Sequence, residues 1–227
     1  MILAGTLLNV VTVAAGSLVG AFLGARIPER FSRVVFQAIG LFTVFIGVAM
    51  ALKTAQVLIP VFSLILGSVA GEALGLEAAF GRLGEWAKAR TGASQAGFAE
   101  GMITAFLLFC VGSMTILGAF EEGTGGGSDL LVAKSIMDGF SSLALASALG
   151  LGVLFSVFPL LLFQGGLTLA AAALGDFIPA AVIAEMSATG GLMLLGLGFT
   201  LLEIRKIPVV NMLPALVVAA ALAAVVG

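Results

Sequence analysis

Hydrophobic residues in this chain form long uninterrupted stretches, and the charged residues gather mostly between them. Membrane-spanning β-strands would instead show roughly ten residues of alternating polarity. Eight of the stretches approach the length of roughly 20 residues that an α-helix needs to cross a bilayer. The pattern therefore predicts an all-α fold, a polytopic transmembrane helical bundle. Its expected spans are 2–25, 33–52, 56–75, 98–119, 130–149, 151–173, 178–202 and 208–226.

Two segments qualify this pattern. The stretches 130–149 and 151–173 almost touch, so they could instead form one broken helix and a re-entrant piece, which would give seven spans. Segment 76–97, between the third and fourth stretches, has apolar residues at roughly helical spacing and contains Trp86. This segment predicts an amphipathic connector helix that lies at the membrane interface, with Trp86 as its anchor.

Composition supports the membrane class and excludes several functions. Hydrophobic residues make up 61% of the chain and charged residues 10%, with a mean hydropathy of +1.24, values that a water-soluble domain does not reach. The first stretch is too long for a signal peptide and lacks a basic start, so we expect it to remain as a helix. A single cysteine and no histidine, with no nucleophile beside a base and no basic stretch with aromatics, predict neither an enzyme nor a nucleic-acid-binding protein. No cofactor or metal is expected.

The basic residues predict the orientation. Under the eight-span pattern, eight of the ten Lys and Arg residues fall on one side, which the positive-inside rule assigns to the cytoplasm. Both termini and the acidic segment 121–129 are then expected outside. The eight residues are Arg26, Arg30, Arg33, Arg82, Lys88, Arg90, Arg205 and Lys206.

Two stretches of sequence also repeat each other at an offset of 151 residues. Segments 18–47 and 169–198 share nine of thirty positions, including a Gly-x-x-Ile-Pro turn and a Gly-Leu pair. The two turns are an odd number of spans apart, so the copies are predicted to have opposite orientations. The expected organisation is one integral membrane domain with repeat one at 1–75, the connector at 76–97, a central two-helix hairpin at 98–149 and an inverted repeat two at 150–227. Inverted repeats are typical of transporters, although channels and structural membrane proteins also contain them.

Polar residues within the spans are the candidates for a substrate or ion pathway, because ionisable groups at that depth are costly. In the hairpin, Lys134 and Asp138 are one helical turn apart and could pair, although Lys134 could also extend to the interface. Asp138 is the deepest carboxylate and the strongest candidate. Ser135 lies beside them. Cys110, Ser113 and Thr115 belong to a short stretch of small and polar residues that would let the fourth helix open locally.

Weaker candidates lie outside the hairpin. Gln164, followed by two glycines, and Asn9 each indicate either a helix break or an interhelical hydrogen bond. Glu185 could face the same cavity as Asp138, and Asn211 is a better candidate for a helix cap than for a ligand. The glycine-rich run 123–129 lacks the Gly-Lys-Ser/Thr ending of a phosphate loop, so a flexible connector is the preferred interpretation.

Four segments of the chain resemble a known family. The runs 109–118, 134–139, 164–166 and 211–215 look like the bacterial membrane proteins grouped as domain of unknown function 554, in the same order and over essentially the whole chain. The resemblance implies a protein of the bacterial inner membrane to which a transport role is ascribed, without an established substrate.

We therefore expect a secondary transporter for a small solute or ion, with Asp138 as the ion- or proton-binding group and Lys134 as its modulator. Ser113, Thr115 and Ser135 would supply hydroxyl ligands. Oxygen ligands without histidine suit protons or Na⁺ better than copper or zinc. A non-transporting scaffold or sensor and an ion channel are the alternatives. Homodimerisation is also plausible, through a small-residue face such as that of Gly16, Gly20 and Gly24.

Overall fold

A computed structural model of the chain describes residues 2–24, 29–91, 98–174 and 179–226. All regular secondary structure in these ranges is helical, which confirms the predicted all-α class. The elements are α1 (Ala4–Gly24), α2 (Glu29–Ala51), α3 (Leu58–Leu74), α4 (Leu76–Thr91), α5 (Phe98–Cys110), α6 (Ser113–Gly123), α7 (Asp129–Leu149), α8 (Gly152–Phe155), α9 (Val157–Leu174), α10 (Ala180–Leu201), the 3₁₀ helix η2 (Val209–Met212) and α11 (Pro214–Val226).

Several of these helices are long and apolar enough to cross a membrane. Within the described residues four segments meet that description: α1, α7, α10 and the run Gly152–Ala173, which joins α8 to α9. Two bent helix pairs, α3 with α4 and α5 with α6, raise the number to six if each pair is one span. The runs Gln37–Ala51 and Val209–Val225 are apolar but shorter. Helix α7 and the run Gly152–Ala173 are each long and apolar enough to cross on their own, as the eight-span pattern expects for 130–173.

The chain bends where the sequence weakens the helix. At Gly75 the backbone adopts φ +64°, a left-handed conformation that suits glycine, and α4 leaves α3 at 53°. The predicted span 98–119 is divided into α5 and α6, which meet at 60° after Cys110. The small and polar residues of that stretch were expected to open the helix locally, and the break lies there. Thr115 Oγ1 donates a hydrogen bond of 2.7 Å to the Phe109 carbonyl, which satisfies one backbone group that the break releases.

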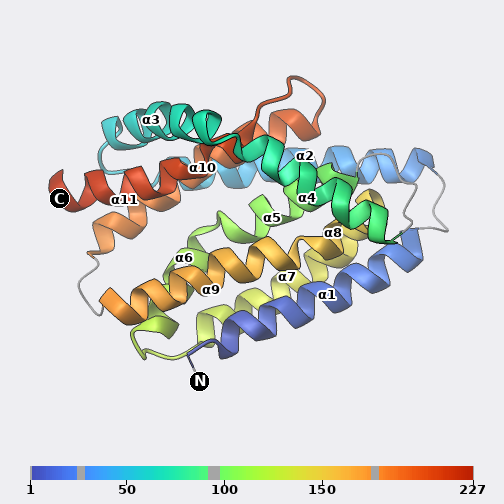
Figure 1. The fold of residues 1–227 in the computed structure, drawn as a ribbon, viewed down its shortest axis with the longest axis horizontal. Helices are drawn as coiled ribbons and strands as arrows, with labels where there is room; N and C mark the ends of the chain where they lie inside the picture. The colour runs from blue at the N-terminus through green and yellow to red at the C-terminus, as the bar shows by residue number, and fades with distance from the viewer. Residues whose placement is uncertain (1, 25–28, 92–97, 175–178, 227) are drawn as a thin grey trace.

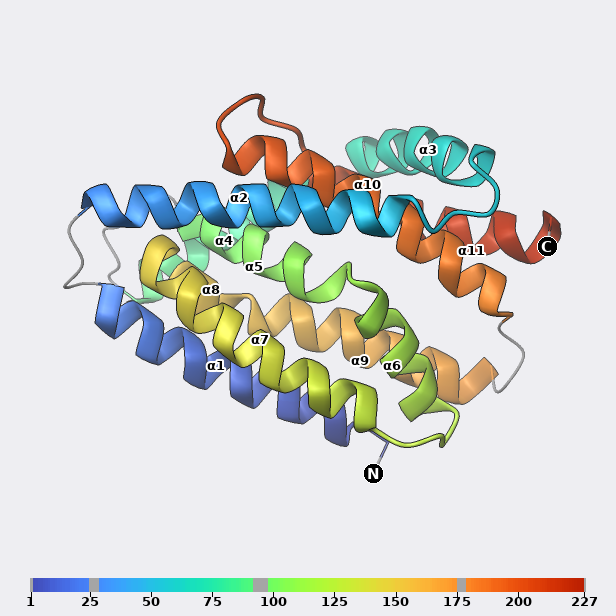
Figure 2. The ribbon, with the colours of Figure 1, turned by 180° about the vertical axis from the view of Figure 1, so that it is seen from behind.

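The helices form two layers (Figure 1). Helices α1, α6, α7 and α9 pack together in one layer, and α2, α3, α10 and α11 in the other. Helices α4, α5 and α8 lie between the layers at one end. Figure 2 shows that the link from α10 to η2, with Arg205 and Lys206, lies at the same end as the start of α2. The turns 52–57 and 124–128 lie at the opposite end.

A seam of glycines joins α1 to α7. A Cβ atom built on Gly16, Gly20 or Gly24 would come within 2.1–2.3 Å of backbone oxygens of α7. The contacts pair Gly20 with Leu143 and Gly24 with Ser147, so the two helices run parallel. The prediction that this small-residue face is available to a second copy of the chain is therefore wrong, because it is already covered by α7 of the same chain.

Helices α2 and α10 cross at four glycines of the predicted repeat. A Cβ on Gly47 would lie 2.8 Å from the carbonyl oxygen of Gly191, and a Cβ on Gly191 would lie 2.7 Å from that of Gly47. Likewise, a Cβ on Gly198 would lie 3.2 Å from the carbonyl oxygen of Gly40. These contacts bring α2 and α10 together in antiparallel orientation. Gly40 and Gly47 stand 151 residues before Gly191 and Gly198, so each glycine meets the counterpart of the other.

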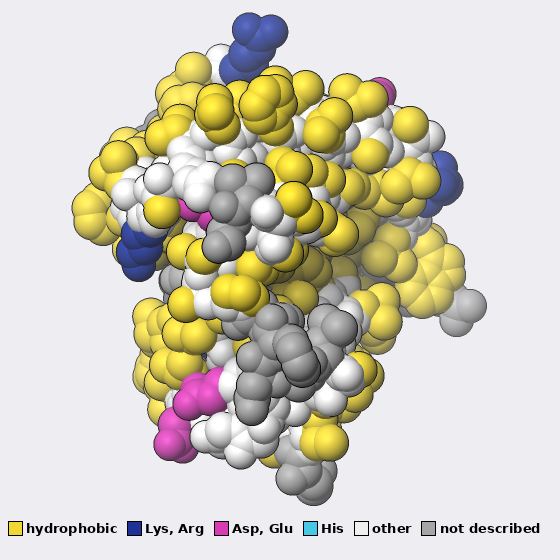
Figure 3. All heavy atoms as spheres, turned by 90° about the vertical axis from the view of Figure 1, so that its left-hand side faces the viewer, with side chains coloured by type: hydrophobic (Ala, Val, Ile, Leu, Met, Phe, Trp, Pro, Cys, Tyr) yellow, Lys and Arg dark blue, Asp and Glu magenta, His cyan; other side chains and the backbone are white. Residues whose placement is uncertain are grey.

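The sides of the bundle carry large apolar side chains that nothing in the described structure covers. Phe45 on α2, Phe140 on α7 and Leu162 on α9 are 68%, 74% and 78% exposed. Figure 3 looks onto the end with the turns 52–57 and 124–128, and hydrophobic side chains surround it on its flanks. Such a surface is unstable in water and suits contact with lipid chains. The interior, by contrast, holds most of the small and polar residues of the helices.

Candidate functional site

The layer formed by α1, α6, α7 and α9 contains a buried ion pair on α7. Lys134 Nζ donates a hydrogen bond to Asp138 Oδ2, and the two residues are 5% and 8% exposed. Asp138 lies nine residues after Asp129, the first residue of α7, or roughly 14 Å along the helix axis. Lys134 Nζ also lies 6.0 Å from the ring centroid of Phe109, at the end of α5. The pair therefore neutralises its own charge close to the middle of a span, as its spacing of four residues predicts.

Two amide side chains connect this ion pair to neighbouring helices. Asn9 Nδ2, on α1, donates to Asp138 Oδ2 at 3.1 Å and to Gln164 Oε1 at 2.9 Å. Gln164, on α9, donates from Nε2 to Thr6 Oγ1 at 3.2 Å. Helix α9 passes through Gln164 and the two following glycines without a break. Of the two interpretations proposed for Asn9 and Gln164, the interhelical hydrogen bond is therefore the correct one.

A second buried carboxylate, Glu122 on α6, extends this network toward the turn 124–128. It is 4% exposed and accepts hydrogen bonds from Gly5 N at 2.7 Å, Ser128 Oγ at 2.8 Å and Thr6 Oγ1 at 3.5 Å. Gly5 belongs to the first turn of α1, whose free N–H groups and dipole favour an anion. The polar cluster, as we call it, consists of Thr6, Asn9, Glu122, Lys134, Asp138 and Gln164.

Sequence reasoning missed Glu122 and Thr6. Glu122 was expected in an exposed acidic segment outside the membrane, but α6 continues to Gly123 and turns this side chain inward. Helical spacing carries the signal that would have found both residues. Ile116, Ala119 and Glu122 are each three positions apart and all buried, and Thr6 precedes the buried Asn9 by the same interval. In a lipid-facing helix, the polar and small side chains mark the face that packs inward.

Other predicted site residues lie apart from the polar cluster or beside it. The Ser135 hydroxyl donates to the Leu131 carbonyl at 2.6 Å, and Thr115 closes the break between α5 and α6. Cys110 is fully buried next to that break. The side chain of Ser113 lies outside the described residues. The hydrogen bonds that Ser135 and Thr115 donate run to backbone carbonyls, those of Leu131, Gly5 and Phe109, and not to side chains of the cluster.

Glu185 and Asn211 hold other parts of the fold. Glu185, on α10, is 2% exposed and accepts hydrogen bonds from Thr54 Oγ1 at 2.6 Å, Ala55 N at 2.8 Å and Gln56 N at 3.1 Å. It therefore ties the α2–α3 link to α10 and does not face Asp138.

Asn211 caps the start of a helix, as expected, but the helix is α4, which is distant in sequence, and not the one that follows Asn211. Its Oδ1 accepts from Glu77 N in the first turn of α4 at 2.7 Å, and its Nδ2 donates to Glu72 Oε2 at 2.6 Å. It thus bridges the bend at Gly75.

The polar cluster has one open position. Asn9 Oδ1 is buried and has no hydrogen-bond partner among the described residues, although such orphaned acceptors are costly. The donors of Lys134, Asn9 and Thr6 reach the two carboxylates, and Gln164 donates to Thr6 Oγ1. A proton, a water or a hard cation would be stabilised by the free acceptor of Asn9 and the carboxylate of Asp138. In the described ranges, no three His, Cys, Asp or Glu side chains gather closely enough to hold a metal ion.

A layered bundle of apolar helices with lipid-facing sides and a buried ionisable cluster defines a polytopic α-helical membrane protein. The chain belongs to the family described as "Protein of unknown function (DUF554)", whose pattern matches residues 4–224. It is 34% identical over 225 residues to "Uncharacterized protein YqgA" of Escherichia coli (strain K12), which covers 97% of this chain and 96% of that protein. It is 31% identical over 218 residues to "Uncharacterized membrane protein YdfK" of Bacillus subtilis (strain 168), covering 94% and 93% respectively. No solved structure matches the chain.

The hydrogen bonds of Glu122 make a stability prediction. Glu122→Gln should lower the free energy of unfolding by about 2 kcal/mol, because it removes the charge that strengthens the bonds from Gly5 and Ser128. Heating in neutral detergent with a thiol-reactive dye measures the change, because Cys110 is a free thiol that is buried in the folded protein and reacts only when the protein unfolds. Glu121→Gln is the matched control: Glu121 Oε2 is buried without a partner, so its loss should cost nothing. Equal destabilisation by both variants would contradict the role given to Glu122.

Proposed function

We propose that this protein is a secondary transporter of a small solute or ion, with the polar cluster as its central binding site. The observation that carries the proposal is the buried Lys134–Asp138 pair, which Asn9 of α1 contacts directly and Gln164 of α9 contacts through Asn9. A purely structural core gains little from such a pair, because apolar residues of similar volume fill the same space without a desolvation cost. Ionisable groups at this depth typically mark a pathway.

The position of the site supports alternating access. Asn9 lies on α1 and Gln164 on α9, the first helices of the two proposed repeats, and they meet through one hydrogen bond. Transporters with inverted repeats usually bind their cargo near the bilayer midplane where the repeats meet. A change in the relative position of α1 and α9 would break or form that bond and so alter the surroundings of Asp138.

The glycine crossings support an inverted relation between the repeats. Gly47 meets Gly191, and Gly198 meets the carbonyl of Gly40, which is the self-complementary pattern of a two-fold axis. Gly67 and Gly71 of α3 meet Ala215 and Asn211 in the same antiparallel sense. A two-fold axis between antiparallel helices lies perpendicular to them, hence in the plane of the membrane.

We further propose eight spans in the bacterial inner membrane, with both termini outside. The shorter apolar helix α2 and the pair η2–α11 would complete the six spans counted by length. The start of α2 and the link from α10 to η2, segments that contain Arg30, Arg205 and Lys206, lie toward one end of the bundle, which suits the cytoplasm. Lipid is then the principal partner of the apolar sides. A homodimer would need a face other than that of Gly16, Gly20 and Gly24.

Asp138 would be the group that binds a coupling proton or Na⁺. Lys134 would act as an internal counter-ion that holds the carboxylate when no external cation is bound. Binding of a cation or proton to Asp138 would release the ammonium group of Lys134 from the carboxylate. Asn9 donates to the same carboxylate oxygen, so the charge of Asp138 would also change the strength of that hydrogen bond. Neither step requires a cofactor or covalent chemistry.

A two-stage experiment tests the proposal. Purified protein is first heated in the presence of ions, amino acids and carboxylates, because a solute that binds the folded state raises its melting temperature. Proteoliposomes then receive the stabilising solute under an imposed pH or Na⁺ gradient. We expect saturable uptake that exceeds equilibrium when the gradient is present. Downhill flux without saturation would favour a channel instead, and the absence of both stabilisation and uptake would favour a scaffold or sensor.

A further inference from the structure

A second candidate site lies between the two helix layers. A cavity of about 330 Å³ opens between α6 and α10, a volume at the lower end of the range for small-molecule sites. Met114 and Leu117 of α6 form one wall, and Ile183, Ala184 and Ser187 of α10 form the other. None of these residues belongs to the polar cluster. The walls are almost entirely aliphatic.

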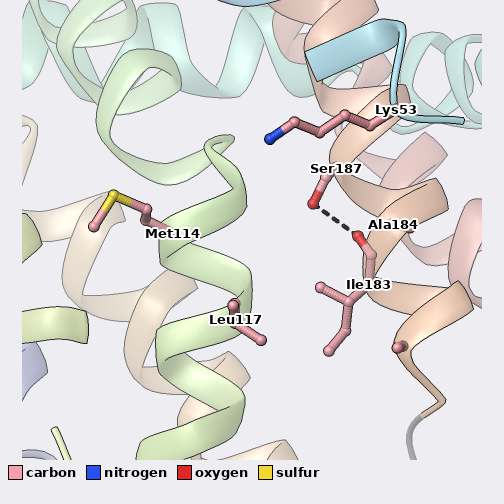
Figure 4. A pocket seen from close by; sticks show the side chains of 7 residues that line it. Lys53, Met114, Leu117, Ile183, Ala184 and Ser187 are labelled. Atoms are coloured by element: carbon pink, nitrogen blue, oxygen red, sulfur yellow. Dashed lines mark hydrogen bonds between the residues drawn. The ribbon is translucent and has the colours of Figure 1, made fainter. Parts of the chain in front are cut away.

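One cation points into this cavity. Figure 4 shows the side chain of Lys53, in the turn that follows α2, extending toward α6 across the space between α6 and α10. Lys53 is exposed and forms no ion pair with any described residue. The structure also explains its direction. The next three residues, 54–56, are held by Glu185 through three hydrogen bonds, so the chain is fixed where Lys53 leaves it.

The other lining residues leave the charge of Lys53 uncompensated. No acidic side chain lines the cavity, and Ser187, which donates its hydroxyl proton to the Ile183 carbonyl at 2.7 Å, adds no charge. Ala180, the first residue of α10, also lines the cavity, and Pro179 provides no side-chain cap for that helix. The helix dipole of α10 adds a positive partial charge at this end of the cavity, of the same sign as the charge of the ammonium group.

From this combination we infer that the cavity binds a small aliphatic carboxylate, with its anionic group at Lys53 and its hydrocarbon body between α6 and α10. An amino acid or sugar would leave polar groups without partners against Met114, Leu117 and Ile183, which costs free energy. A cationic ligand would be repelled by Lys53. The inference goes beyond the proposed transport function, because it names a second site, apart from the polar cluster, and the class of ligand that this site takes. Binding there can be measured without transport.

Hexanoate is the probe for this site. We expect hexanoate to raise the melting temperature of the purified full-length protein in neutral detergent, whereas hexylammonium and 1-hexanol at equal concentrations do not. Lys53→Gln should weaken the apparent affinity for hexanoate by about tenfold through loss of one charged contact. Lys53→Arg should retain the effect. Lys206→Gln, which removes an exposed lysine at the opposite end, is the matched control and should leave the affinity unchanged.

Three results would overturn the inference: no stabilisation by hexanoate, equal stabilisation by hexylammonium, or an unchanged affinity after Lys53→Gln. Ala184→Leu, which fills the cavity without altering charge, should also abolish the effect, and retention would place hexanoate elsewhere. A failure of hexanoate binding with intact ion-coupled uptake, or the reverse, separates this inference from the proposed transport function.

An anionic lipid offers the same chemistry, a negatively charged group on a hydrocarbon body. Nanodiscs of neutral phosphatidylcholine and nanodiscs that contain phosphatidylglycerol distinguish the two sources. A free carboxylate site predicts that hexanoate stabilises the protein equally in both. If phosphatidylglycerol removes the hexanoate effect in a manner that depends on Lys53, the resident ligand is lipid and the inference of a solute site is wrong.

Discussion

Asp138→Asn is expected to abolish gradient-driven uptake in proteoliposomes. The substitution keeps the shape of the side chain and removes the charge that would bind a coupling proton or Na⁺. It also leaves the ammonium group of Lys134 buried without its counter-ion, which typically costs about 3–5 kcal/mol when one partner of a buried pair is lost. The variant therefore loses transport for two separable reasons, and a second variant is needed to distinguish a missing ligand from a damaged fold.

The double variant Lys134→Gln/Asp138→Asn separates them. It removes both charges together, so the buried site becomes neutral and its melting temperature should return close to that of the wild type. Uptake should nevertheless remain absent, because no carboxylate is available to bind the ion. If the double variant transports at the wild-type rate, the ion pair is not the coupling site. A solute that still stabilises the double variant would show that solute and ion bind at different places.

Gly191→Ala is expected to destabilise the packing of α2 against α10. Its Cβ would lie 2.6 Å from Ala51 N and 2.7 Å from the Gly47 carbonyl oxygen, so α2 and α10 would have to separate. We expect the free energy of unfolding to fall by about 2 kcal/mol or more, the cost of overpacking, although alanine is the better helix former. Reactivity of Cys110 with a thiol dye during heating measures the change.

Gly81→Ala is the matched control for this prediction. Gly81 lies within α4 and has nothing within 4 Å of an added Cβ, so the same substitution should stabilise the protein by about 1 kcal/mol. Gly47→Ala should resemble Gly191→Ala, and the two together should cost less than their sum, because both relieve the same crossing by the same displacement. Equal behaviour at positions 81 and 191 would contradict the crossing at Gly47.

Helix content and helix ends were predictable because backbone polar groups in lipid must be satisfied within the chain. The local opening after Cys110 followed from a run of small and polar residues, and the pairing of Lys134 with Asp138 followed from their spacing. The burial of Glu122 was not predictable from its acidic neighbours. A charge near the end of a span can face solvent or the interior equally well in sequence. For Glu122 the partners at the start of α1, Gly5 and Thr6, decide between the two.

Contacts between residues far apart in sequence were the other part of the site that could not be predicted. Asn9 and Gln164 were recognisable as polar residues in apolar helices. The two partners of Asn9, Asp138 and Gln164, lie 129 and 155 residues away from it. Glu185 shows the same difficulty, since a carboxylate in a span suggested a ligand site, and its actual partners are the amides of the α2–α3 link. One-dimensional patterns identify which side chains need a partner; the three-dimensional crossing supplies it.

The parallel seam of α1 and α7 has a mechanical consequence. Gly16, Gly20 and Gly24 bring the two backbones into close contact, so α1 and α7 are expected to move together as one rigid unit. Asn9 and Asp138 both belong to this unit, and the 3.1 Å hydrogen bond between them should persist through any rearrangement. Gln164 lies on α9, which is not part of the α1–α7 pair. In a rearrangement of the helices, the hydrogen bond from Asn9 to Gln164 is therefore expected to break first. A vibrational probe on either side-chain amide would record its loss.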